Sequence, residues 1–199
     1  MKAVKVLPHE FSKLKRKPKI NDFWKSYFNN LSVEFSKHLF HTIKNPLTVR
    51  LVNCGSFEFE HYYNQLEEQS LIQFFNVYPH NTWGFYYLPY RTVDLLLTNL
   101  LGGSNHSEDN SKHEISNIDQ KVLSVVFNKM VSLLQAPLEE GMRNISIELL
   151  NTNKNELLSY TAIQSQNVCV QEYLIEVNGE FYSIDLVFSS NFLETFTIL

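Results

Sequence analysis

The stretch Asn45-Pro-Leu-Thr-Val-Arg-Leu51 joins the end of a long amphipathic segment to the start of an alternating one. Its Asn-Pro dipeptide ends a helix, because the residue before a proline disfavours the helical region. The apolar residues Leu47, Val49 and Leu51 then alternate with polar ones, as in a half-buried strand. The stretch Arg143-Asn-Ile-Ser-Ile-Glu-Leu149 repeats this arrangement. We therefore predict two related α-β-β-β halves that share one sheet.

A helix of about six turns is predicted before the first of these stretches, from Asn21-Asp22 to Asn45-Pro46. Asn21 or Asp22 can cap its start by accepting hydrogen bonds from free backbone N–H groups. The apolar residues recur at spacings of three and four, which is typical of an amphipathic helix: Phe23, Trp24, Tyr27, Phe28, Leu31, Phe35, Leu39 and Ile43.

The second half opens with a corresponding long helix. Its start, Ser116-Asn-Ile-Asp119, resembles a capping box, and Pro137 is predicted to end it. The density of apolar residues predicts burial over much of its surface: Ile118, Val122, Leu123, Val126, Phe127, Met130, Leu133 and Leu134. A shorter helix is predicted from about Pro89 to Leu101, with Gly102-Gly103 closing it in a left-handed conformation.

Strand patterns fill the segments between the helices. They cover 47–52, 57–60, 70–78, 82–88, 145–150, 167–176 and 180–188. Asn178-Gly179 predicts a tight type I′ hairpin between the last two. In the final strand Tyr182, Ile184, Leu186 and Phe188 are predicted to face inward, and Ser183 and Asp185 to face outward.

Composition and charge exclude several classes of protein. With 199 residues and 44% hydrophobic residues, the chain can bury a core, which excludes wholesale disorder. Seven of the 17 basic residues precede residue 20, against Glu10 alone, so residues 1–20 are expected to form a basic, disordered leader. The rest carries a net charge of −10, which would repel phosphate backbones and argues against nucleic-acid recognition.

The sequence predicts a cytoplasmic protein without a transmembrane segment. The longest apolar run, from Val93 to Leu101, is interrupted by polar residues and is far shorter than the ~20 residues that span a bilayer. The N-terminus lacks the apolar region of a secretory signal. Cys54 and Cys169 are too few for a disulfide scaffold and lack the spacing of a zinc site. Both are expected to be small, buried, unreactive thiols.

Motifs for catalysis or metal binding are weak. Glu34, His38 and His41 could lie on one helix face and bind a metal, but a solvated polar face is the favoured interpretation. The sequence has no nucleophile elbow, phosphate loop or dinucleotide fingerprint. We therefore expect no catalytic residue, no metal and no cofactor.

The glycine pair is the most informative local feature. The chain has six glycines, and Gly102 and Gly103 are adjacent at a helix end, before the polar loop predicted over 104–113. A plain helix cap is the simpler interpretation. The functional interpretation is a surface that a partner protein can approach closely.

Taken together, residues 22–199 resemble the middle domain of the flagellar motor switch protein FliM family, which is related to the CheC-type chemotaxis phosphatases. The resemblance rests on the order and spacing of four segments, each weak by itself. They are Leu31-Ser-Val-Glu-Phe35, the helix and loop from Tyr90 to Asn105, Ile115-Ser-Asn-Ile-Asp119, and the terminal segment from Ile184 to Glu194.

The resemblance implies a three-layer α/β/α sandwich over residues 21–199 and a structural role in the switch ring of a bacterial flagellum, for motility and chemotaxis. In the family a Gly-Gly-x-Gly loop contacts the rotor protein FliG. Gly102, Gly103 and Ser104 match this loop, and Asn105 replaces its last glycine. The resemblance also implies side-to-side self-association, a FliN-like protein as a further partner, and a location in the cytoplasm against the inner membrane at the flagellar basal body.

Two alternatives remain open at this stage. The first is the cytoplasmic ring of a type III secretion system, which has a similar architecture. The second is a CheC-type phosphatase of phosphorylated CheY, which uses an Asp/Ser-x3-Glu-x2-Asn motif. The second long helix offers Ser116, Gln120 and Leu123 at this spacing, and the first offers Asp22, Ser26 and Asn29, so neither supplies the glutamate. We also expect that the chain holds neither the family's CheY-binding segment nor its FliN-like domain.

Overall fold

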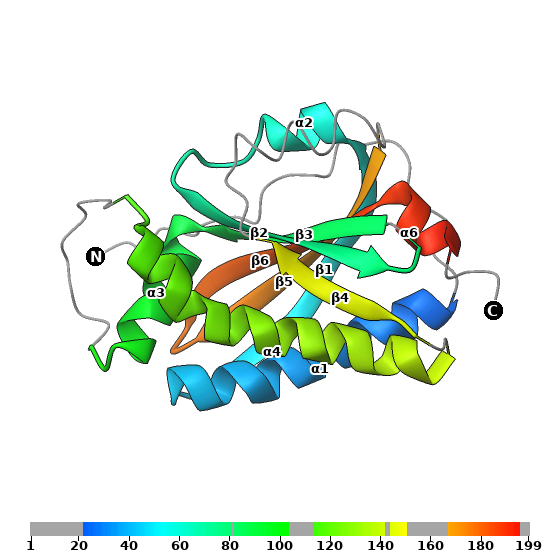
Figure 1. The fold of residues 1–199 in the computed structure, drawn as a ribbon. Coiled ribbons are helices and arrows are strands. Elements are labelled where there is room, and N and C mark those ends of the chain that lie inside the picture. Colours follow the sequence, from blue (N-terminus) through cyan, green and yellow to red (C-terminus); the bar gives the residue numbers. More distant parts are fainter. Residues whose placement is uncertain (1–21, 81, 104–113, 142–143, 151–166, 196–199) are drawn as a thin grey trace.

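Antiparallel strands form the sheet around which the helices of the described chain are arranged (Figure 1). The computed structural model describes residues 22–80, 82–103, 114–141, 144–150 and 167–195. The elements of the first half are α1 (Asp22–Ile43), β1 (Leu47–Glu58), α2 (Phe59–Tyr63), β2 (Ser70–Tyr78), β3 (Thr82–Pro89) and α3 (Tyr90–Leu100). Those of the second are α4 (Asn117–Gly141), β4 (Ser146–Leu150), β5 (Asn167–Val177), β6 (Glu180–Ser189) and α6 (Ser190–Thr195).

The sheet separates two layers of helix. Its strand order is β1-β5-β6-β3-β2-β4, and every neighbouring pair is antiparallel. In Figure 1 the helices α1 and α4 lie together on one side of the sheet, with α3 at one end of the molecule, and α2 lies on the other side. This arrangement confirms the predicted mixed α/β sandwich.

The strand order is symmetric between the two halves. Exchanging β1 with β4, β2 with β5 and β3 with β6 gives the same order read from the opposite edge. The register agrees: Val77 pairs with Ile147, while Ile175, 98 positions after Val77, pairs with Val49, 98 positions before Ile147. The same offset relates the two stretches that resemble one another in the sequence, which confirms the predicted internal repeat.

The long helices show the same repeat in their buried faces. The buried residues of α1 are Trp24, Tyr27, Phe28, Leu31, Ser32, Phe35, Leu39 and Ile43. Those of α4 lie 99 positions after the first seven of these: Leu123, Val126, Phe127, Met130, Val131, Leu134 and Leu138. The second half is therefore one residue shorter between the buried face of its helix and its first strand. The two faces form most of the helical side of the main core cluster.

Buried tyrosine hydroxyls connect this helical layer internally and to the sheet. Tyr27 of α1 donates to the Leu134 carbonyl of α4 at 2.5 Å. From the sheet, Tyr86 donates to the Met130 carbonyl and Tyr173 to the Phe28 carbonyl, each at 3.3 Å. A buried hydroxyl without a hydrogen-bond partner is costly. These bonds therefore fix where each helix lies relative to the sheet.

The second face of the sheet carries its own apolar cluster and a buried acid. Asp185 of β6 is 5% exposed, so the prediction that it faces outward is wrong. The reason is that α2 and neighbouring residues cover this face, and Tyr62 of α2 donates to Asp185 Oδ2 at 2.7 Å. Burial, with a smaller contribution from the charge of Glu172, raises the pKa of Asp185 to about 7, and the bond from Tyr62 opposes this shift.

Three further sequence predictions differ from the structure. Phe59 begins α2 instead of extending a strand, because its side chain is buried in the apolar cluster on the second face of the sheet. Pro137 lies inside α4, which continues to Gly141 because Leu138 is buried in the main core. Ile118 is 73% exposed, because it lies on the side of α4 opposite the buried residues Leu123 and Phe127.

Other predicted elements agree closely or lie outside the described residues. The hairpin at Asn178-Gly179 has positive φ at both residues, and α3 begins at Tyr90, one residue after the predicted start. The leader over 1–20 and the loop over 104–113 fall on residues that the structure does not describe. No helix in the described ranges is long and apolar enough to cross a membrane.

Gly84 in the central strand β3 leads to a first prediction. An added Cβ would lie 2.5 Å from the Val187 carbonyl oxygen and 2.6 Å from the Phe75 ring. Since the carbonyl belongs to the neighbouring backbone, Gly84→Ala should lower the free energy of unfolding by about 3 kcal/mol in urea titrations. Gly55→Ala is the control, because the atoms nearest to its added Cβ belong to the ring of Phe57, a side chain that can move. Equal losses in the two variants would contradict this explanation.

The buried carboxyl of Asp185 leads to a prediction about pH. Between its ordinary pKa of 3.8 and about 7, the unfolded chain loses a proton that the native chain keeps, so rising pH lowers the free energy of unfolding. Above that window both states are ionised and the effect is constant. Asp185→Asn removes the penalty and keeps an acceptor for Tyr62.

The variant should therefore be more stable than the native chain by about 2–4 kcal/mol at pH 7.5, and the difference should shrink towards pH 4.5. Denaturant unfolding at several pH values measures it. Asp94→Asn, at an exposed position on α3, is the control for removal of one carboxylate. A stability difference that does not change with pH would show that Asp185 is ionised throughout.

Candidate functional site

Helix α3 is anchored to the sheet through its first turns. Its buried residues are Thr92, Val93, Leu95 and Leu96. The Thr92 hydroxyl donates to the Ser183 carbonyl of β6 at 2.8 Å. Arg91 lies 5.4 Å from the ring centre of Tyr182 and 3.6 Å from the Glu180 carboxylate. These contacts to the opposite half of the chain fix the direction in which α3 leaves the sheet.

The glycine pair closes α3 in a Schellman motif. The N–H of Gly103 donates to the Thr98 carbonyl at 2.8 Å, and that of Gly102 to the Asn99 carbonyl at 3.3 Å. Gly102 has φ +77°, a conformation that residues with a Cβ rarely adopt. The predicted left-handed closure is confirmed at Gly102. The helix cap alone explains why glycines stand at both positions, without any partner protein.

The same turn presents an exposed surface at one end of the molecule. The side chain of Leu101 is 68% exposed, and both glycines that follow are exposed. An added Cβ on Gly103 would lie 3.0 Å from the Thr98 methyl, so the turn is closely packed on its inner side. Ser104 and Asn105 of the predicted site lie outside the described residues. The described site is therefore an exposed leucine followed by two exposed backbone units.

Leu101 was missed at the level of sequence. It follows Leu100 and stands at the predicted end of the helix, and no sequence pattern marked it as exposed or as part of a site. The signal that could have identified Leu101 as exposed is its position just before the glycines. Leu101 is the C-cap residue, where the chain turns away from the core, and its side chain is therefore in solvent.

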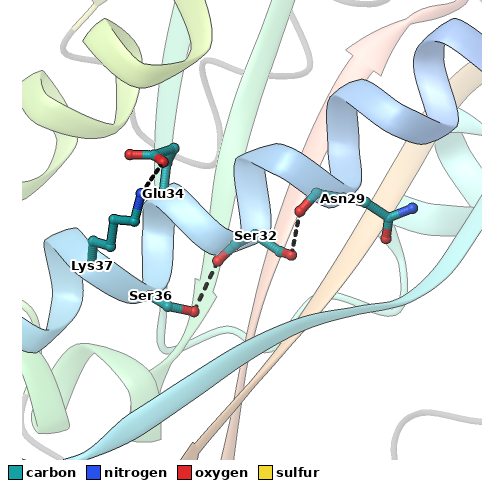
Figure 2. A network of polar contacts seen from close by, with 5 residues as sticks. All are labelled: Asn29, Ser32, Glu34, Ser36 and Lys37. Atoms are coloured by element: carbon teal, nitrogen blue, oxygen red, sulfur yellow. Dashed lines mark hydrogen bonds and ion pairs between the residues drawn. The ribbon is translucent and has the colours of Figure 1, made fainter.

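The alternative metal site on α1 is not assembled. Figure 2 shows the Glu34 carboxylate bound to Lys37, with Nζ 2.6 Å from Oε1. His38 is packed against α4, and burial lowers its pKa, opposed by a hydrogen bond with the Val126 backbone. Among the residues that the structure describes, no group of three metal-ligating side chains comes together.

Serines on the same helix have a structural role. Ser32 Oγ donates to the Asn29 carbonyl at 2.6 Å and Ser36 Oγ to the Ser32 carbonyl at 2.9 Å (Figure 2). Ser36 Oγ also accepts the backbone N–H of Val49 at 2.9 Å. This polar row therefore connects α1 to the first strand of the sheet.

The phosphatase motif is also not assembled on either long helix. Ser116 binds Asp119 in a capping box, with Ser116 Oγ and N–H each 2.8 Å from the Asp119 carboxylate. Leu123, which stands where the motif has asparagine, is fully buried. On α1 the Asn29 amide donates to the Lys25 carbonyl of its own helix. No carboxylate at the motif spacing stands on either helix to orient an attacking water.

Comparison with known proteins identifies the family of the chain. The sequence model of the family "Flagellar motor switch protein FliM" matches residues 19–197. No curated protein sequence matches the chain significantly.

Among solved structures, the FliM middle domain from Vibrio alginolyticus is 17% identical, with a TM-score of 0.67, covering 86% of this chain and 98% of that one. FliM in a FliG-FliM complex from H. pylori is 11% identical, with a TM-score of 0.71, covering 85% and 94%. Thermotoga maritima FliY is 15% identical, with a TM-score of 0.72, covering 92% and 96%. These likenesses show the fold, and the match of the family model over most of the sequence shows that the chain belongs to the flagellar motor switch protein FliM family.

Proposed function

We propose that this chain connects a FliG-like rotor protein to the rest of the flagellar motor switch, of which its family makes it a component, and that it binds this rotor protein through the turn at the end of α3. The observation that carries the proposal is the exposed Leu101 beside two exposed glycines on a turn fixed by backbone hydrogen bonds. The solved FliG-FliM complex from H. pylori, whose FliM chain has the same fold, supports the choice of partner.

The chemistry of the turn suits a protein partner. A leucine side chain provides apolar area at the centre of a contact, and glycines allow close approach to exposed backbone groups. The turn cannot easily change shape, because it is held by the bonds from Gly102 and Gly103. We propose that Ser104 and Asn105 extend the same contact.

The proposed role is structural and not enzymatic. The buried position of Leu123 and the capping contacts of Ser116 support this choice over the phosphatase. Membership of a flagellar family favours the motor switch over a secretion apparatus. We propose a cytoplasmic location against the inner membrane at the basal body, side-by-side association with like chains, and residues 21–199 as the folded unit.

The proposal predicts that Leu101→Asp weakens binding to the FliG-like protein of the same genome at least tenfold, about 1.4 kcal/mol. A charge would be placed in an apolar contact, while the exposed position should leave folding unchanged. Titration calorimetry with the purified full chain measures the dissociation constant. Gly102→Val with Gly103→Val should have a similar effect, because Gly102 has positive φ and Gly103 packs against Thr98.

Phe23→Asp is the matched control. Phe23 is 55% exposed at the start of α1, which Figure 1 places at the opposite end of the molecule from α3. It should bind like the native chain. Unchanged binding by Leu101→Asp would refute the assigned surface, and absence of binding by the native chain would refute the assigned partner. Thermal unfolding of each variant verifies that the fold is retained.

A further inference from the structure

The two cysteines of the chain lie on neighbouring strands, at diagonal positions of the ladder. Cys54 lies on the edge strand β1, directly opposite Gln171 of β5, and Cys169 of β5 lies opposite Ser56. Tyr173, which belongs to the main core, shares its face of β5 with Gln171 and Cys169, because alternate residues of a strand point the same way. The register therefore places both thiols on one face, two residues apart in the ladder.

A buried amide contacts both sulfurs. Gln171 Nε2 lies 3.2 Å from Cys169 Sγ and 3.5 Å from Cys54 Sγ. The Gln171 side chain is fully buried, and its Oε1 has no hydrogen-bond partner. Leaving a buried acceptor unpaired is unfavourable, so an apolar residue would be the more stable choice here. What the glutamine adds is a donor to sulfur, and donors favour the thiolate over the thiol.

The two thiols have different environments. Cys54 is half-buried on the edge of the sheet, whereas Cys169 is only 3% exposed. A hydrogen bond from the Cys169 thiol, together with the Gln171 amide, lowers the pKa of Cys54 against the effect of burial. The same contact and burial raise the pKa of Cys169. The accessible sulfur is therefore the nucleophile, and the buried one is placed to react with it second.

We propose that Cys54 and Cys169 form a redox-modifiable pair that closes to an intramolecular disulfide when a hydroperoxide oxidises Cys54. The Cys54 thiolate attacks a peroxide oxygen, the O–O bond breaks, and Cys54 becomes a sulfenic acid as hydroxide leaves. The Cys169 sulfur then attacks Cys54 Sγ, the S–O bond breaks, and the departing hydroxide takes the Cys169 proton as water. Overall, two thiols lose two electrons and one hydrogen peroxide becomes two waters.

The disulfide would connect the two halves of the fold. Cys54 belongs to the first half and Cys169 to the second, and the chain between them includes β2, β3, α3 and α4. Closing so long a loop restricts the unfolded chain strongly. In a reducing compartment such a bond is typical of transient, redox-sensing pairs and not of permanent scaffolds.

The test treats the folded, reduced full chain with a small molar excess of hydrogen peroxide. We expect the free thiols to fall from two per chain to none, and a digest without reductant to contain a peptide linking Cys54 to Cys169. The midpoint of thermal unfolding should rise and should return to its starting value after dithiothreitol. Cys54→Ser and Cys169→Ser, treated identically, should show no rise.

Any of three outcomes would overturn the proposal. Both thiols could remain free after peroxide treatment, or a disulfide could form only between chains. In the third outcome, Cys54 accumulates as sulfinic acid while Cys169 stays a free thiol. Gln171→Leu tests the donor while removing the unpaired oxygen, so the fold should be retained. At pH 7 iodoacetamide should alkylate Cys54 about three- to tenfold more slowly in this variant. An unchanged rate would show that Gln171 does not position or activate the pair.

Discussion

Among the described strands, the first strand of each half pairs with a strand of the other half. In the part of the chain that the structure describes, β1 pairs with β5 and β4 pairs with β2, so each half completes the sheet of the other. An unpaired strand would leave its backbone groups exposed, and a half alone would also leave one long helix without the second helix beside it. The repeat is therefore one cooperative unit, although its sequence reads as two similar segments.

The position of the candidate site depends on this pairing of strands between the two halves. Helix α3 belongs to the first half, yet its polar anchors are Ser183, Tyr182 and Glu180 on β6 of the second half. The end of α3 can thus be placed accurately only when both halves are folded together. A partner protein that binds there would contact a surface whose geometry depends on the whole sheet, even though the residues that touch it are few.

Sequence patterns predicted a helix, strand or turn well where residues close together in the sequence decide which side chains are buried. The stripe of α1, the glycine closure of α3 and the Asn178-Gly179 hairpin all depend on residues close together in sequence. The errors arise where a distant segment changes the environment. Asp185 was predicted to be exposed, because no residue near it in the sequence indicates that Tyr62 covers it. Cys54 and Cys169 looked unrelated because only the pairing of β1 with β5 brings them together.

The site itself could be predicted only in part, for a related reason. The glycines were visible in the sequence, but the exposed leucine beside them was not, since exposure depends on where the sheet-facing stripe of α3 ends. The backbone bonds of Gly102 and Gly103 hold this turn without using its outer surface. A surface that is already ordered loses little conformational entropy on binding, so more of the apolar burial at Leu101 is available as affinity. A structural cap and a docking surface are therefore compatible uses of the same two glycines.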